Sequence, residues 1–132
     1  MASLKLRQAT MDDAKDLLSW KNDPVTREFS IVTHDEIKWE NHLKYLENHI
    51  QDIMIIELDG RKCGDIRVDD EVSIRLAPEC RGKGIGYRAL KMVVEPGMIA
   101  HIVYGNVASM RLFTKLGFMA FDHGEGYYKL KL

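Results

Sequence analysis

A sequence of 132 residues is long enough for one compact domain, residues 1–132, and leaves little room for a second. Its 45% hydrophobic and 30% charged residues allow a buried core, while a net charge of −1 lacks the basic excess of a nucleic-acid-binding surface. No run of 18 apolar residues could span a membrane, and no signal peptide is visible, so we expect a cytoplasmic protein. Two cysteines are too few for a disulfide framework and indicate reduced thiols.

The first 50 residues predict a strand followed by two helices. Residues 3–7 alternate polar and apolar side chains, as a half-buried strand does. Thr10, with Asp13 three residues later, is a short capping box that begins a helix, and Asp23-Pro24 ends it. Thr33-His34-Asp35-Glu36 is a second capping box, and the apolar spacing up to residue 50 predicts an amphipathic helix.

The remainder predicts a meander of strands and then alternating helices and strands. Asp59-Gly60 favours a tight hairpin, since both residues tolerate positive φ. The complete order is β-α-α-β-β-β-α-β-α-β-β, which describes a mixed α+β domain with about four helices on one central sheet. The expected strands are 53–58, 62–68, 72–76, 98–104, 118–121 and 127–130, and the expected helices are 85–94 and 106–116.

The glycine-rich segment Arg81-Gly82-Lys83-Gly84-Ile85-Gly86 lies between a strand and a helix. A helix start presents unpaired N–H groups, and glycines let an anion approach the backbone closely, which favours a phosphate-bearing ligand. The spacing excludes a Walker A loop, and Tyr87 stands where a dinucleotide fingerprint needs glycine, which disfavours an NAD-dependent dehydrogenase. The alternative reading is a tight connection without a ligand.

Two patterns together resemble the GNAT superfamily of N-acetyltransferases. Arg81, Gly84 and Gly86 match the family's Arg/Gln-x-x-Gly-x-Gly/Ala loop, and a second pattern downstream matches at Asn106, Ser109, Gly117 and Phe118. The likeness covers residues 62–132 well and residues 3–50 in outline. It implies a central, mostly antiparallel sheet with a splayed parallel pair of strands, acetyl-CoA as co-substrate without a metal, and an amine acceptor in a ternary complex.

The resemblance also implies roles for individual residues. The loop amides would bind the CoA pyrophosphate, the main chain of Leu76 and Ala77 would pair with pantetheine, and the N–H near Leu76 would polarise the thioester carbonyl. Asn106 would face the thiol end of the cofactor. The implied cofactor site comprises Leu76, Ala77, Arg81, Gly82, Lys83, Gly84, Ile85, Gly86, Asn106, Ser109 and Phe113, of which Leu76, Asn106 and Ser109 are the catalytic candidates.

The sequence does not identify the general acid or the general base. Phe113 stands where the family usually has a tyrosine acid, so Tyr104, Ser109, Tyr127 or a water would have to substitute. Cys80 beside Arg81 is weighed as a nucleophile and disfavoured. His42 and His49 on one helix are too few ligands for a metal site. The candidate bases are Glu28, Glu57, Asp65, Asp69 and Glu71.

The stretch from Leu18 to Arg27 resembles a Trp-Arg/Lys-Asn-Asp-Pro-x-x-Arg pattern of one GNAT branch. This branch contains ribosomal-protein N-terminal acetyltransferases and nucleotide-aminosugar acetyltransferases of nonulosonic acid pathways. It implies a nucleotide-linked aminosugar as the favoured acceptor, with a protein N-terminal amine or a non-catalytic acyl-CoA sensor as alternatives, and leaves a homodimer open. The substrate-side candidates are Trp20, Asn22, Arg27 and Phe29.

Overall fold

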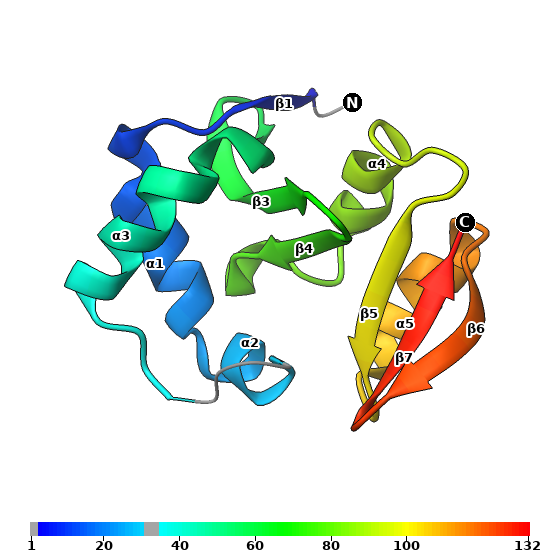
Figure 1. Cartoon of the computed structure of the whole chain (residues 1–132). Helices are drawn as coiled ribbons and strands as arrows, with labels where there is room; N and C mark the ends of the chain where they lie inside the picture. Colours follow the sequence, from blue (N-terminus) through cyan, green and yellow to red (C-terminus); the bar gives the residue numbers. More distant parts are fainter. Residues whose placement is uncertain (1–2, 31–34) are drawn as a thin grey trace.

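The computed structural model describes residues 3–30 and 35–132, which form two antiparallel sheets and five α-helices (Figure 1). The mixed α+β class and the expected element order are confirmed. Short 3-10 turns occur at Met11–Asp13, Ile50–Asp52 and Pro78–Cys80. The strands are β1 (Leu4–Gln8), β2 (Ile53–Leu58), β3 (Arg61–Val68), β4 (Val72–Leu76), β5 (Ile99–Val103), β6 (Met119–Gly124) and β7 (Tyr127–Lys131). The helices are α1 (Ala14–Asn22), α2 (Pro24–Glu28), α3 (Trp39–His49), α4 (Ile85–Lys91) and α5 (Val107–Lys115).

The strands do not form one continuous sheet. The first sheet has the order β1-β2-β3-β4 and the second the order β5-β7-β6. Neither sheet assignment pairs β4 with β5, although the two strands lie side by side where the sheets meet (Figure 1). The expected splayed pair therefore takes the form of two neighbouring strands without a hydrogen-bonded ladder.

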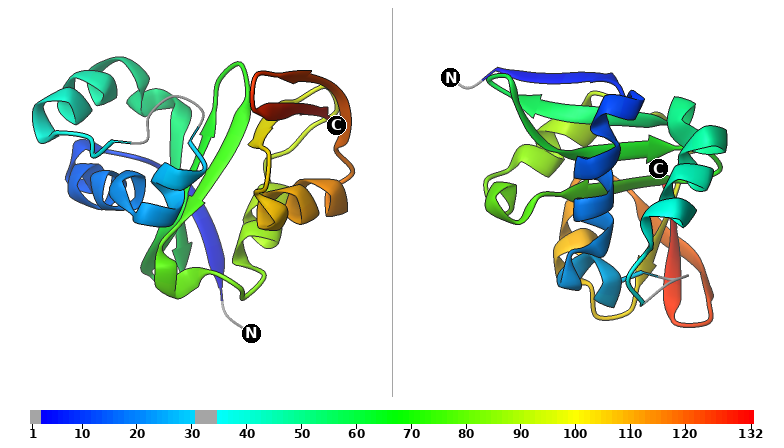
Figure 2. Two further views of the ribbon diagram at one scale, coloured as in Figure 1. Left: turned by 90° about the horizontal axis from the view of Figure 1, so that it is seen from below. Right: turned by 90° about the vertical axis from the view of Figure 1, so that its left-hand side faces the viewer.

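The core lies on both faces of the first sheet. Helices α1 and α3 cover one face and α4 covers the other (Figures 1 and 2). Because β2 is covered on both sides, its side chains do not alternate between core and solvent, and Ile53, Ile55 and Ile56 are all fully buried. Leu17 of α1 and Leu46 of α3 complete the core on one face.

The hairpin between β2 and β3 has the predicted geometry. Asp59 and Gly60 have φ of 52° and 80°, both in the left-handed region that a two-residue turn of this kind requires. A glycine is also required inside β3, since a Cβ on Gly64 would lie 2.1 Å from the carbonyl oxygen of Arg75.

Three helix boundaries differ from the prediction. The segment Asp23-Pro24 ends α1 but also begins α2, because the Asp23 carboxylate accepts from the Thr26 N–H at 3.3 Å and proline fits the first helical turn. This short helix raises the expected four helices to five. Helix α3 begins only at Trp39, since the Ile37 N–H donates to Asn22 Oδ1 and the Ile37 C=O accepts from Asn22 Nδ2. Thr33 and His34 of the predicted capping box lie outside the described residues, and α4 ends at Lys91 instead of residue 94.

Candidate active site

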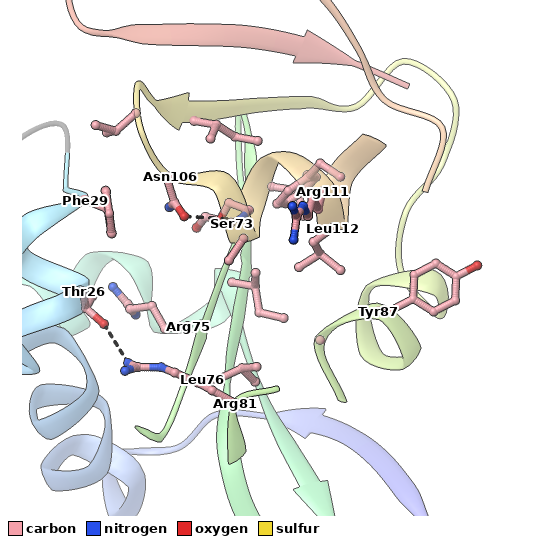
Figure 3. Close-up of a pocket in the computed structure, with 18 of the residues that line it drawn as sticks. Thr26, Phe29, Ser73, Arg75, Leu76, Arg81, Tyr87, Asn106, Arg111 and Leu112 are labelled. Carbon is pink, nitrogen blue, oxygen red and sulfur yellow. Dashed lines mark hydrogen bonds between the residues drawn. The ribbon is translucent and has the colours of Figure 1, made fainter. Parts of the chain in front are cut away.

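A cleft of about 690 Å³ lies between the two sheets. Its walls come from α2, the turn before β4, β4 itself, the glycine-rich loop, β5 and α5 (Figure 3). The predicted site residues that line it are Phe29, Leu76, Arg81, Gly82, Gly84, Ile85, Gly86, Asn106, Ser109 and Phe113. Most of the cofactor-side prediction therefore converges on one cavity.

The edge of β4 that faces this cleft carries free backbone groups. The Ala77 N–H donates to the Cys63 carbonyl at 2.8 Å, and the register places Arg75 opposite Asp65. In an antiparallel ladder the bonded residues alternate, so the N–H and C=O groups of Ile74 and Leu76 point away from β3. These groups can accept or donate to an extended ligand that lies along β4.

Ala77 cannot take the predicted main-chain role. Its N–H is bonded to Cys63, and its C=O accepts from the Cys80 N–H at 2.9 Å. Its side chain is buried, and the residue does not line the cleft. The prediction for Ala77 is corrected because both of its backbone groups are already used by the fold.

The glycine-rich loop leads directly into α4. Gly82 and Gly84 have φ of 72° and 77°, and the Gly84 carbonyl accepts the first helical hydrogen bond from Arg88 at 3.2 Å. The N–H groups of the residues that follow Gly84 have no earlier carbonyl in the helix to bond. Gly86 allows close packing, since a Cβ there would lie 3.4 Å from Leu112 of α5 and 3.6 Å from Leu76. The loop can therefore present N–H groups to an anion.

The charged side chains of this loop do not surround the N–H groups at the start of α4. Arg81 donates to Asp23 at 2.8 Å and reaches the Thr26 hydroxyl at 3.5 Å, so it links the loop to α2 (Figure 3). Burial raises the pKa of Asp23, but the bonds from Arg81 and the Thr26 N–H lower it more, so the carboxyl stays ionised. Lys83 is exposed and does not line the cleft. The predicted pyrophosphate contacts are thus limited to the backbone.

Helix α5 forms the opposite wall. Asn106 is its N-cap, and its Oδ1 accepts from the Ser109 N–H at 3.2 Å (Figure 3). Phe113 is 3% exposed and packs edge-on against Phe118, with 5.1 Å between the ring centroids. Phe113 has no hydroxyl group, so this position supplies packing instead of an acid.

Three of the four predicted substrate-side residues have structural contacts instead. Trp20 is 5% exposed in the core, Asn22 holds the backbone of Ile37, and the Arg27 Nε donates to the Asn22 carbonyl at 3.1 Å. None of these three side chains lines the cleft, whereas Phe29 does. Of the predicted substrate-side residues, Phe29 therefore faces the cleft, while the side chains of Trp20, Asn22 and Arg27 make contacts within the fold.

Of the five candidate bases, one lies in the cleft and four lie outside it. Glu71 lines the cleft, while Glu28, Glu57, Asp65 and Asp69 do not. Asp65 is 1% exposed and receives both a 2.9 Å and a 3.2 Å bond from Arg75, and Glu57 receives a 2.9 Å bond from Arg7. Both carboxylates already accept hydrogen bonds from a guanidinium, so their oxygens are engaged within the fold.

The thiol and phenol alternatives also have other contacts. Burial raises the pKa of the Cys80 thiol to about 11, with a contribution from the neighbouring Cys63, so Cys80 is not a thiolate near neutral pH. Tyr104 packs against Tyr128 on the second sheet, and Tyr127 lies beside His101. Neither tyrosine lines the cleft.

Several polar residues of the cleft were not predicted. Arg67 donates to Glu71 at 3.1 Å, and Glu71 contacts His101 of β5 across the gap between the sheets. The β3–β4 register places Asp65 opposite Arg75 and Arg67 opposite Ser73. The sequence did carry a signal for these pairs, because the polar residues stand at equal distances before and after residue 70. Two antiparallel strands joined by a turn there bring such residues opposite each other.

A buried lysine lies behind this polar group. Lys21 of α1 is 9% exposed, and its Nζ lies 3.6 Å from the centroid of the Tyr45 ring. Burial and the positive charge of Arg75 lower the pKa of Lys21 to about 7. His42 is also buried, and its Nε2 bonds the Ala14 carbonyl at 2.8 Å, which makes it a core histidine.

Within residues 3–30 and 35–132, no cluster of three or more His, Cys, Asp or Glu side chains could hold a metal ion. In the same described part of the chain, no helix has the length and apolar character that crossing a membrane requires.

Comparison with known proteins agrees with this geometry. Residues 3–119 match the family model of the acetyltransferase (GNAT) domain. A crystal structure of a domain from Methanocaldococcus jannaschii superposes with a TM-score of 0.90 at 23% identity and covers 100% of this chain and 99% of that one. Ribosomal-protein-alanine N-acetyltransferase from Brucella melitensis gives a TM-score of 0.78 at 26% identity, covering 96% of both chains. An uncharacterised M. jannaschii protein, MJ1062, is 26% identical over 96% of this chain, which spans 31% of that protein's length.

The chain belongs to the GNAT acetyltransferase family. The cleft between β4 and β5 is lined by most of the residues that the family resemblance assigns to the cofactor, with Ala77 and Lys83 as the exceptions.

Proposed function

We propose that this enzyme acetylates the primary amine of a nucleotide-linked aminosugar. The observation that carries the proposal is the charge of the cleft. Glu71 is the one carboxylate among the described residues that line it. The cationic side chains in its walls are Arg67, Arg75, Arg81, Arg111 and Lys115, of which the first three are also paired with carboxylates of the fold. An acceptor with a diphosphate suits such a surface better than a cationic amine does.

The cofactor fits the remaining groups. Free N–H groups at the start of α4 suit the pyrophosphate, and the backbone of Leu76 and Ile74 suits an extended amide arm and a thioester carbonyl. When bound, acetyl-CoA supplies the activated acetyl group. Arg111 and Lys115 on α5 provide positive charge on the same side of the cleft as the loop.

The acceptor then enters from the side of α2. Phe29 and Thr26 line this part of the cleft, and Arg75 projects into it from β4 (Figure 3). A cavity of about 690 Å³ lies within the range of small-molecule sites, which is about 300–1,000 Å³. Arg81 of the glycine-rich loop pairs with Asp23 at the start of α2. The element that would hold the cofactor and the element that would hold the acceptor are therefore joined by one ion pair.

A protein N-terminal amine is the second candidate. The likeness to the Brucella melitensis ribosomal-protein-alanine N-acetyltransferase favours it. A peptide acceptor needs an extended path for several residues, and it gains less from a cationic wall.

The test is release of free CoA from acetyl-CoA by the purified protein, with three acceptors compared directly. The acceptors are a nucleotide-linked aminosugar, the same aminosugar without its nucleotide, and a peptide with N-terminal alanine. We expect the nucleotide-linked form to have a kcat/KM at least 100-fold above the free aminosugar. Equal values would refute recognition of the diphosphate, and turnover of the peptide alone would favour the second candidate.

A further inference from the structure

His101 and Glu71 meet at the end of the cleft that lies farthest along β4 from the glycine-rich loop. His101 Nδ1 contacts Glu71 Oε2, and both residues line the cleft. We propose that His101 is the general base that accepts the proton of the acceptor ammonium, and that Glu71 positions its ring. This inference rests on the proposed acetyl transfer and names the base that the sequence left open.

The position along β4 supports this role. Glu71 directly precedes β4, while the glycine-rich loop follows it, so the strand separates the two by about 16 Å at roughly 3.3 Å per residue. A ligand held by the loop at one end and aligned with the free edge of β4 brings its other end toward Glu71 and His101. Along the edge of β4 that points away from β3, the N–H groups that can donate to the thioester carbonyl follow in the order Val72, Ile74 and Leu76, from Glu71 toward the loop.

The contact with Glu71 defines the chemistry of the imidazole ring. An ionised carboxylate accepts hydrogen bonds only, so the Nδ1 that contacts it carries the proton when the ring is neutral. The Nε2 then has a free lone pair, which is the form that takes up a proton. The Tyr127 ring packs at 5.1 Å from the imidazole centroid and limits its rotation.

The charges around the pair favour His101 over Glu71 as the base. Arg67 donates to Glu71 at 3.1 Å and also pairs with Asp69 at 3.1 Å, so the Glu71 carboxylate is neutralised from the side of β3. On the other side, Lys129 of β7 lies opposite His101 in the β5–β7 register. A carboxylate held by a guanidinium is a weak proton acceptor, whereas the free imidazole nitrogen is available.

The proton and bond changes balance. The acceptor ammonium loses one proton to His101 Nε2, and the neutral amine forms the new N–C bond at the acetyl carbon. The C–S bond breaks, and the CoA thiolate takes the second proton that the nitrogen releases. His101 then returns its proton to solvent, so the overall reaction yields the amide, CoA and one proton.

The first test compares His101→Gln with His123→Gln, whose histidine is exposed on β6 outside the cleft. We expect His101→Gln to lower kcat by about 10²- to 10⁴-fold, to flatten the rise of kcat with pH, and to leave acetyl-CoA affinity by calorimetry within twofold. His123→Gln should keep the native values. A kcat for His101→Gln within threefold of the native enzyme would overturn the proposal.

A second readout does not need turnover. In ¹⁵N NMR of the protein without ligands, above the pH at which the ring is neutral, we expect His101 to carry its proton on Nδ1. Glu71→Ala should remove this preference, and Glu71→Gln, whose amide oxygen can still accept from Nδ1, should retain it. A proton on Nε2 in the native protein would refute the assignment of the base. If the native protein binds no acetyl-CoA, or acetylates no amine, the proposed function fails instead.

Discussion

The two sheets of this protein are stabilised in different ways. The first sheet and its helices contain buried ionic groups, including Asp13 at 1% and Asp65 at 1% exposure, each held by an arginine. In the described part of the second sheet, the one contact between a carboxylate and a basic side chain is that of His101 with Glu71, and it leads back to the first sheet. The difference shows that ionic contacts are concentrated in the first sheet and its helices, while apolar and aromatic packing holds the second sheet.

This arrangement has a consequence for the reaction. Buried ion pairs have directional bonds, so they fix the positions of Arg75 and Glu71 more tightly than apolar contacts would. The cofactor wall relies on backbone groups of β4 and α4, which need only the correct chain path. Each prediction below tests one side of this contrast against the other.

The largest effect is expected at Asp13. Its carboxylate receives bonds from Arg7 at 2.8 and 2.9 Å and lies 2.8 Å from Lys62 Nζ. Asp13→Ala removes the buried carboxylate that receives these charge-assisted bonds, while Arg7 keeps Glu57 and Lys62 keeps Asp16, and we expect the free energy of unfolding in urea at pH 7 to fall by about 3–5 kcal/mol. Asp122→Ala, at an exposed position on β6, should change it by less than about 0.5 kcal/mol.

The same variant has a defined pH dependence. The bonds from Arg7 and then Lys62 hold the pKa of Asp13 well below its usual range, despite the opposing effect of burial. A depressed pKa stabilises the fold above the ordinary value of about 3.9 and loses this contribution as the pH falls below it. The difference between native protein and Asp13→Ala should therefore shrink below about pH 4. A constant difference from pH 7 to pH 3 would contradict the ionic explanation.

The next effect concerns the cofactor side. Gly84→Trp places a large side chain at the entrance to α4, where the open space is that expected for the pyrophosphate. We expect acetyl-CoA affinity by calorimetry to fall at least about 100-fold, or about 2.7 kcal/mol. Gly84→Ala has the same left-handed strain at φ 77° without the bulk, and Gly60→Trp has it at φ 80° away from the cleft. Both controls should bind acetyl-CoA, and native affinity of Gly84→Trp would refute the loop assignment.

The lining of the cleft around the glycine-rich loop and the start of α5 is also the part whose geometry the sequence predicted best. The positions of Gly84, Gly86 and Asn106 follow from local rules, because helix starts and left-handed turns restrict residue type within a few positions. The free edge of β4 follows from its place at the end of an antiparallel meander. Each of these inferences needs only short-range information.

Prediction of the residues on the acceptor side of the cleft needed contacts between segments far apart in the sequence. Trp20 and Asn22 belong to a motif that resembles a known pattern, but only the packing of α1 and the path of residues 35–38 show that both turn inward. The pairing of Glu71 with His101 joins positions 30 residues apart on different sheets. Periodicity cannot report such a contact, because it depends on how two sheets meet.

A smaller effect, of opposite sign, is expected at Lys21. Burial and Arg75 lower its pKa from 10.5 to about 7, so the charged form destabilises the fold below pH 7, and this cost disappears as the pH rises toward 10.5. We expect Lys21→Met to raise the free energy of unfolding at pH 6 by about 1–3 kcal/mol, since loss of the contact with Tyr45 offsets part of the gain.

The matched control is Lys131→Met, at an exposed position on β7, which should change stability by less than about 0.5 kcal/mol. The advantage of Lys21→Met should be smaller at pH 10 than at pH 6. If Lys21→Met is less stable than the native protein at pH 6, the ammonium on the Tyr45 ring contributes more than its burial costs, and the acceptor side is ionic in its core as well.

The smallest effect is expected on β6, the outer strand of the second sheet. Met119 is 74% exposed and Phe121 is 54% exposed, so neither contributes to the core. Phe121→Ser should change the free energy of unfolding by less than about 0.5 kcal/mol, whereas Phe118→Ala, which removes a side chain that is 1% exposed, should cost about 3–5 kcal/mol. The measurement is urea unfolding at two protein concentrations tenfold apart. The urea midpoint of the native protein could rise with protein concentration while that of Phe121→Ser does not. This result would show that a second copy covers β6 in solution, and packing between copies would then stabilise the second sheet.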